Sequence, residues 1–192
     1  MAIDQDRPVA ADPYSLLPRV PLFSLTSTDI SDGQPLPTAQ TSDGGSISPQ
    51  LSWSGFPLET KSFLLTCFDP DSPKEDGLWL WLVADIPSDV TSIPAGNSTS
   101  MMKALASRFF RPASSIGVEE AIDLPNGSGT VGFSGAAPEK GDRVHRYYFA
   151  VHALDVETLE LPHGRRTAPD LAAATAVPHT IARAVLMGTH QR

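Results

Sequence analysis

The chain has 192 residues, a hydrophobic fraction of 41% and a formal net charge of −8 at pH 7. This length suits a single globular domain, and the acidic balance argues against a nucleic-acid partner. No apolar run approaches the roughly 18 residues that suggest a membrane-spanning helix. The lone cysteine, Cys67, excludes an internal disulfide and fits the reducing cytoplasm, where we expect the protein to reside.

Residues 1–20 have the composition of an irregular leader, with prolines at short intervals and without the apolar region of a signal peptide. The remainder, 21–192, contains no internal repeat and no second boundary, so we expect one domain. The whole chain carries 14 glycines and 18 prolines, which favours a β-rich fold with many turns.

Five strands are predicted from apolar alternation or short apolar runs. They cover, in chain order, 21–27, 51–53, 62–68, 78–86 and 144–154. The fourth, LWLWLVADI, is apolar on both faces until Asp85, which indicates a central strand that is covered on both sides. Its tryptophans Trp79 and Trp81, together with Trp53, are expected in the core.

Two helices are predicted near the C-terminus, within 170–176 and 178–187. The second begins with a proline and ends before a glycine, which are the preferences of helix ends. The segment 98–121 is an atypical insertion, and its 101–111 stretch has one apolar and one cationic face. We expect an amphipathic helix packed on the domain, with a lid or a dimer contact as alternatives.

The common catalytic and metal-binding motifs are missing from this sequence. No histidine lies in an HExxH or paired Cys/His spacing, so no metal site is predicted. There is no GxSxG elbow, no phosphate-binding P-loop and no GxGxxG motif. We therefore expect a protein that is not an enzyme and needs no cofactor.

One polar constellation remains. The turn Asp69-Pro70-Asp71-Ser72-Pro73 closes one strong strand, and His145 and Tyr147 lie near the start of another. Because side chains alternate along a strand, His145 and Tyr147 point to one face. Arg146 points to the other face, as does His152. His145, Tyr147 and the carboxylates of the turn predict a small polar pocket. The alternative is that these groups only form a structural hydrogen-bond cluster.

At these residues the sequence resembles the phosphatidylethanolamine-binding protein (PEBP) family, in the bacterial branch that is often labelled Raf-kinase-inhibitor-like. The resemblance extends over about 21–188. It is carried in order by Asp32-Gly33 with Pro37, SPQLSW at 48–53, DPDSP at 69–73, LWLWLVADIP at 78–87, GFSGAAPEKGD at 132–142 and HRYYFAVHALD at 145–155.

The resemblance implies an antiparallel β-sandwich with a few peripheral helices, one of them near the C-terminus. It also implies a shallow pocket for a small anionic or phosphoethanolamine-like ligand. By position, the pocket residues would be Asp69, His145 and Tyr147, with Gly135 and Pro138 in the loop wall.

Structural support is implied for three further residues. Asp71 and Arg146 would form a pair that buttresses the two motifs. Pro73 falls where the family tends to have a cis peptide bond, which proline tolerates better than other residues.

Three positions depart from the family pattern. Leu80 stands where the family has a second pocket histidine, so one donor to an anion is lost. Phe133 replaces the usual tyrosine, and Glu139 adds negative charge where proline is common. A charge-assisted hydrogen bond contributes about 1.5–3 kcal/mol, so anion binding should be roughly ten- to a hundredfold weaker than with the histidine present.

Three functions stay open from the sequence. The first is a binding module for an anionic or lipid-head ligand that regulates a partner protein. The second is an inhibitor or scaffold with a vestigial pocket, and the third is a hydrolase that uses His145 as a base. A homodimer is a further possibility, suggested by bacterial relatives.

Overall fold

The computed structural model describes residues 7–74, 76–97 and 121–192. Its main element is an antiparallel sheet with the strand order β6-β4-β3-β7-β8. These strands are β3 (Ser62–Asp69), β4 (Leu78–Pro87), β6 (Ile122–Asp123), β7 (His145–Leu154) and β8 (Thr180–His190).

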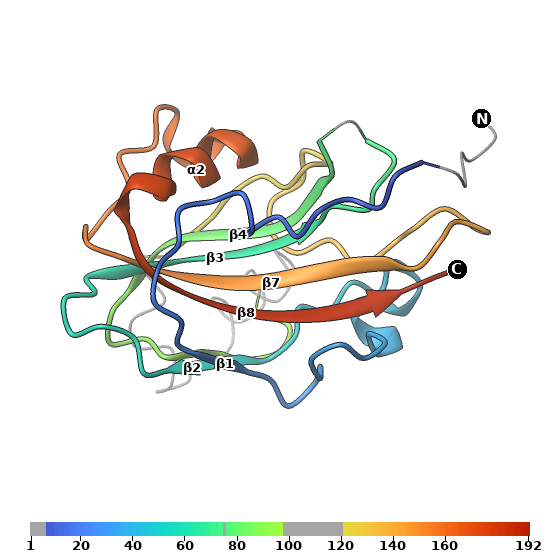
Figure 1. Cartoon of the computed structure of the whole chain (residues 1–192), viewed down its shortest axis with the longest axis horizontal. Coiled ribbons are helices and arrows are strands. Elements are labelled where there is room, and N and C mark those ends of the chain that lie inside the picture. The colour runs from blue at the N-terminus through green and yellow to red at the C-terminus, as the bar shows by residue number, and fades with distance from the viewer. Residues whose placement is uncertain (1–6, 75, 98–120) are drawn as a thin grey trace, which may run out of the picture.

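A smaller antiparallel sheet faces the main sheet, with β1 (Ser24–Thr26), β2 (Leu51–Ser54) and β5 (Ser92–Ile93) in the order β1-β2-β5. Helix α2 (Pro169–Ala176) lies on the opposite side of the main sheet (Figure 1). Short 3₁₀ turns occupy 38–40, 42–44, 164–166 and 177–179. The prediction of a mostly antiparallel β-sandwich with a helix near the C-terminus is confirmed.

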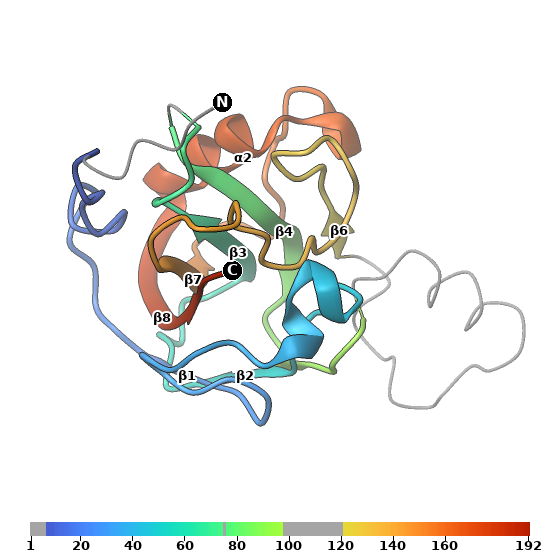
Figure 2. The same ribbon diagram turned by 90° about the vertical axis from the view of Figure 1, so that its right-hand side faces the viewer.

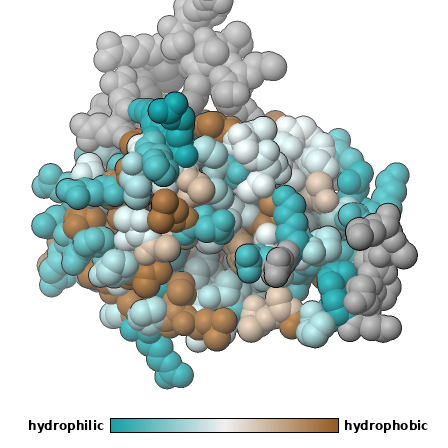
Figure 3. Space-filling view, turned by 90° about the horizontal axis from the view of Figure 1, so that it is seen from above, coloured by the Kyte–Doolittle hydropathy of each residue, from teal (hydrophilic) through white to brown (hydrophobic). Residues whose placement is uncertain are grey.

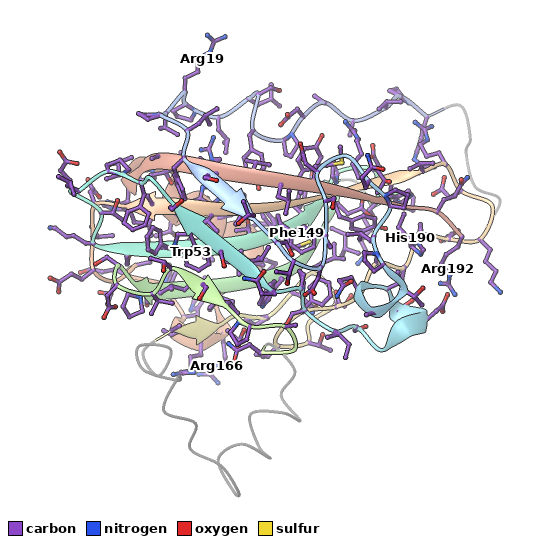
Figure 4. All side chains as sticks on the ribbon, turned by 90° about the horizontal axis from the view of Figure 1, so that it is seen from below. Arg19, Trp53, Phe149, Arg166, His190 and Arg192 are labelled. Carbon is purple, nitrogen blue, oxygen red and sulfur yellow. The ribbon has the colours of Figure 1, made fainter. Side chains whose placement is uncertain are left out.

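The larger core fills the space between the two sheets. Alternate residues of β7, among them Phe149 and Val151, face the small sheet and are fully buried. From the small sheet, Trp53 meets the ring of Phe63 edge to face, with centroids 5.5 Å apart. Figure 4 looks through the small sheet from below, with Trp53 and Phe149 labelled in this region. The alternation that predicts strands therefore also selects the side chains of the sandwich core.

A second core lies between the main sheet and α2. It joins Leu64, Leu82 and Leu154 of the sheet to Ala172 and Ala176 of the helix. The small alanine side chains let the helix approach the sheet closely. Both faces of the central strands are thus buried, as their continuous apolar runs predict.

The helix predicted within 178–187 is wrong, because this segment is the strand β8. It pairs with β7 along nearly its whole length, from His190 opposite His145 to Thr180 opposite Leu154. Ala182 and Ala184 face the sandwich core at a period of two, although alanine favours helices when isolated. Pairing with a long buried neighbour therefore outweighs local propensity.

The outer edge of β8 is covered by the chain between residues 21 and 36. The backbone N–H of Phe23 donates to the carbonyl of Arg183 at 3.2 Å, and that of Leu36 donates to Thr189 at 2.7 Å. A long bare strand edge would be a template for aggregation. These contacts satisfy the edge of the sheet within the same chain.

The predicted amphipathic stretch 101–111 and most of the insertion 98–121 lie outside the described residues. Among the residues that the structure does describe, no helix has the length and apolar character needed to cross a membrane.

We expect Phe149→Ala to lower the free energy of unfolding by about 3–5 kcal/mol, because it empties a fully buried site. Leu58→Ala is the matched control, since Leu58 is fully exposed and its truncation should change stability by no more than about 0.5 kcal/mol. Urea unfolding of both variants measures the difference. Similar losses from both would contradict the placement of the core.

Candidate ligand pocket

A cavity of about 370 Å³ opens at the end of the main sheet where β3 ends and β7 begins. Figure 2 looks toward this end of the molecule, with the C-terminus in front. The cavity brings together all five residues predicted to form the pocket, and Leu80 and Pro73 also border it. Its lining comprises Ser42, Ser46, Asp69, Ser72, Pro73, Lys74, Leu78, Leu80, Ser128, Ser134, Gly135, Ala137, Pro138, Glu139, His145 and Tyr147.

His145 lies buried between two carboxylates. Its Nδ1 is 2.8 Å from Asp69 Oδ2, and its Nε2 is 3.1 Å from Asp142 Oδ2. The leader adds a cation, because Arg7 donates to both Asp142 oxygens at 2.9 and 2.8 Å and lies 3.4 Å from His145 Nε2. Two carboxylates thus face one imidazole and one guanidinium, and both ring nitrogens of His145 have partners.

The charges around His145 determine its protonation. Burial alone would lower its pKa, but the hydrogen bonds and charges of Asp69 and Asp142 raise it above the ordinary value. The hydrogen bond from Arg7 holds the pKa of Asp142 far below its usual range. The two carboxylates therefore favour the protonated ring of His145 and hold it in a fixed orientation.

Tyr147 stands beside this cluster on the same face of β7. Its ring stacks near that of His145, with centroids 6.4 Å apart. The residue is 1% exposed, and its hydroxyl makes no hydrogen bond of ordinary geometry with the described residues, although the Asp69 carboxylate lies near it. Burial, followed by the nearby charge of Asp69, raises its pKa, so the hydroxyl stays protonated. It is a buried donor in the wall of an open cavity, where such groups normally have partners.

Leu80 reaches the pocket through an irregularity in β4. Cys67 pairs with Trp81 and Phe68 pairs with Trp79, so Leu80 is the extra residue of a β-bulge. A bulge can redirect a side chain at the end of a sheet. Here it places a buried leucine in the cavity lining, at the position where the family resemblance implies a histidine.

Asp71 and Arg146 form the pair that the resemblance implies. Arg146 Nε donates to Asp71 Oδ2 at 2.7 Å, and its terminal nitrogen donates to Oδ1 at 2.8 Å. The backbone N–H of Arg146 also donates to Asp71. Burial would raise the pKa of Asp71, but these hydrogen bonds lower it below its ordinary value. The pair joins the turn after β3 to the start of β7.

Gly135 and Pro138 belong to the loop that walls one side of the cavity. A side chain at Gly135 would meet the backbone of Thr41 at 2.4 Å, so only glycine fits there. Phe133 does not line the cavity: it packs in the sandwich core against Trp81.

The cis peptide bond expected before Pro73 is wrong, because the Ser72–Pro73 bond is trans. Pro73 still borders the cavity. The turn is held from within by Asp69, whose Oδ1 accepts from the N–H of Asp71 at 2.9 Å.

Sequence reasoning missed Asp142 and Arg7. Asp142 lies three residues before His145 and ends the GFSGAAPEKGD motif at 132–142, and these two signals could have pointed to it. Arg7 is 135 residues from Asp142 along the chain, and its contact depends on how the leader packs. The leader, predicted as irregular, has neither helix nor strand in its described part, yet it contributes to the pocket.

We expect the His145 ring to titrate above about 6.5 in an NMR experiment. Because its folded pKa is raised, its stabilising contribution is complete below the unfolded value and is lost as pH rises through the folded pKa. Asp142→Asn should lower the midpoint by removing one carboxylate, while Asp155→Asn, beside the exposed His179, should not. A wild-type midpoint at or below 6.5 would contradict the assigned charge state.

Comparisons with known proteins identify the family and the fold. A family model described as phosphatidylethanolamine-binding protein matches residues 26–191. The UPF0098 protein YbhB of Escherichia coli is 38% identical over 147 residues, covering 74% of this chain and 84% of that protein. The crystal structure of E. coli YbcL, described as a member of the mammalian PEBP family, matches with a TM-score of 0.75 at 33% identity, covering 88% of this chain and 98% of that one. The PEBP homologue CT736 of Chlamydia trachomatis matches with a TM-score of 0.69 at 31% identity, covering 89% of this chain and 98% of that one. This chain therefore belongs to the phosphatidylethanolamine-binding protein family.

Proposed function

We propose that the protein binds a compact ligand with a phosphate-like group in the pocket beside His145. The observation that carries this proposal is Tyr147, which lines the cavity and whose buried hydroxyl makes no hydrogen bond of ordinary geometry with the described residues. A ligand oxygen would satisfy it. A buried donor without a partner is costly, so a site of this kind is best explained by an acceptor that arrives with the ligand.

The rest of the lining supports a small polar ligand. Five serines border the cavity, at positions 42, 46, 72, 128 and 134. Ser134 already donates to the carbonyl of Leu80, and the other hydroxyls can donate to an anionic oxygen. Lys74 and Glu139 bring opposite charges to the same wall. A zwitterion such as phosphoethanolamine offers each of them a counter-charge, whereas inorganic phosphate serves only Lys74.

Leu80 limits the strength of this binding. A leucine cannot donate to the anion, and His145 directs both of its nitrogens to carboxylates instead of toward a ligand. The ligand must therefore be held mainly by hydroxyl groups. Neutral hydrogen bonds contribute less than charge-assisted ones, so we expect affinities in the millimolar range.

The partners of His145 also favour ligand binding over catalytic turnover. A general base needs a ring nitrogen that can accept a proton from the nucleophile. Both nitrogens of His145 lie beside carboxylates, and its pKa is raised. We propose that the pocket does not hydrolyse esters; turnover that is abolished by His145→Ala would overturn this.

An inhibitor or scaffold with a vestigial pocket is the second candidate function. The observation that favours it is the apolar wall at Leu78 and Leu80, which could mark a pocket that has lost its ligand. Regulation of a protein partner, a homodimer and a cytoplasmic location stay predictions for either function.

The test is an NMR titration of the full chain with inorganic phosphate and with phosphoethanolamine. We expect saturable shifts at Tyr147 and His145, with tighter binding of phosphoethanolamine if Glu139 meets its ammonium group. Leu80→His should tighten binding about ten- to a hundredfold by adding a charged donor. Tyr147→Phe should weaken it about tenfold.

Tyr14→Phe is the matched control, because Tyr14 contacts the opposite face of the sheet, where its hydroxyl bonds to Thr66. If only Leu80→His responds to either ligand, the native pocket is vestigial and the proposed binding function is wrong. If Glu139→Gln leaves the preference for phosphoethanolamine unchanged, the rim does not recognise the ammonium group.

A further inference from the structure

A second cavity, of about 330 Å³, lies on the opposite face of the main sheet. Its walls come from the leader, from α2 and from strands β3, β4, β7 and β8. The lining residues are Pro13, Tyr14, Leu17, Leu64, Phe68, Trp79, His152, Ala173, Ala174, Val177 and Thr180. Figure 3 looks down on this side of the molecule, and apolar residues gather on its left part.

This cavity is separate from the pocket beside His145. His152 lies seven residues further along β7, so the two histidines point to opposite faces of the sheet. The packed main sheet lies between them, and no residue lines both cavities. One ligand cannot occupy both sites.

Among the residues that the structure describes, the lining contains no charged side chain, and nearly all of its polar groups already have partners. The hydroxyl of Tyr14 lies 3.3 Å from that of Thr66, and the hydroxyl of Thr180 donates to the carbonyl of Ala176 at 2.8 Å. The indole N–H of Trp79 donates to Asp170 at 2.6 Å. An ion would find no counter-charge here, so the cavity suits a neutral and mostly apolar molecule.

His152 is the exception. It is 7% exposed, and its Nδ1 accepts a hydrogen bond from Arg183 Nε at 3.3 Å. Arginine is only a donor, so Nδ1 carries no proton and the proton of the neutral ring is on Nε2. Burial, reinforced by the charge of Arg183, lowers the pKa of His152 to about 3, which keeps the ring neutral. The hydrogen bond from Arg183 to Nδ1 is the one that the ring makes with the described residues, so Nε2–H is left to face the cavity.

The orientation of His152 is fixed from two sides. The ring of Tyr14 lies 5.8 Å from that of His152, centroid to centroid, and the guanidinium of Arg183 lies 5.0 Å from the centre of the Tyr14 ring. A leader residue, Tyr14, and a cation of β8, Arg183, thus hold one neutral N–H donor at an apolar cavity. This is the usual composition of a small-molecule site: apolar walls with a few fixed polar groups.

We propose that this cavity binds a neutral, largely apolar small molecule that presents a single hydrogen-bond acceptor to Nε2–H of His152. The volume admits about two fused aromatic rings or a short aliphatic chain. A folded peptide segment would bring several backbone polar groups into walls that offer one donor, so a small molecule fits better.

The test uses two probes of similar shape. The ketone 2-acetylnaphthalene carries one acceptor, and 2-ethylnaphthalene carries none. We expect both to bind the full chain saturably, with shifts of the His152 ring and a change in Trp79 fluorescence. The ketone should bind about tenfold more tightly, because only it accepts from Nε2–H. Equal affinities, or no saturation by either probe, would overturn the proposal.

Ala173→Leu places three further carbons in the cavity and should weaken both probes about tenfold or more. Ala95→Leu is the matched control, because Ala95 is exposed in a distant turn. Tyr147→Phe should leave both affinities unchanged, which keeps this test independent of the pocket beside His145. Sedimentation of the same variants adds a further outcome: a dimer that Ala173→Leu dissociates would make the cavity a contact between two copies and overturn the small-molecule proposal.

Discussion

The ion pair between Asp71 and Arg146 is the interaction on which the geometry of the pocket depends. It joins a turn that ends one strand to the first residues of another, across 75 positions of the chain. Asp71 is buried and accepts three hydrogen bonds from Arg146, two from the guanidinium and one from the backbone. A bidentate pair fixes orientation as well as distance. Because Arg146 is held on one face of β7, its neighbours His145 and Tyr147 must face the cavity on the other.

The same alternation gives the molecule two chemically different faces. Odd-numbered residues at the start of β7 carry the polar cluster, and further along they fill the core between the sheets. Even-numbered residues carry Arg146 and then His152, whose surroundings are almost wholly apolar. The two histidines differ in charge for this reason. Two carboxylates raise the pKa of His145 and favour its protonated form, whereas burial beside Arg183 keeps His152 neutral. Residue type alone therefore does not decide what either histidine can do.

Much of the fold could be predicted from sequence because its central strands are long apolar runs, buried on both faces. The segment 178–187 could not, since its alanines favour a helix and only pairing with β7 makes it a strand. In the pocket, local patterns and the family resemblance identified Asp69, His145 and Tyr147 correctly as neighbours. They could not identify Arg7, whose contact with Asp142 depends on the path of the leader over the sheet. They also placed Leu80 at the pocket by alignment, without the β-bulge that turns it there.

Leu80 and the cluster around His145 together leave the pocket with little net positive charge for an anion. Two carboxylates, Asp69 and Asp142, balance one imidazolium and one guanidinium, so the floor of the pocket is close to neutral. Leu80 lies beside this cluster and carries no charge, so none of these described side chains directs a cation at a bound anion. The positive charge that remains in the lining is Lys74, and Glu139 opposes it. Long-range attraction of anions is therefore weak, and the binding that we propose relies on short-range donors such as the Tyr147 hydroxyl. Hydroxyl donors select by position more than by charge, so in this protein the shape of the ligand should matter more than its net charge.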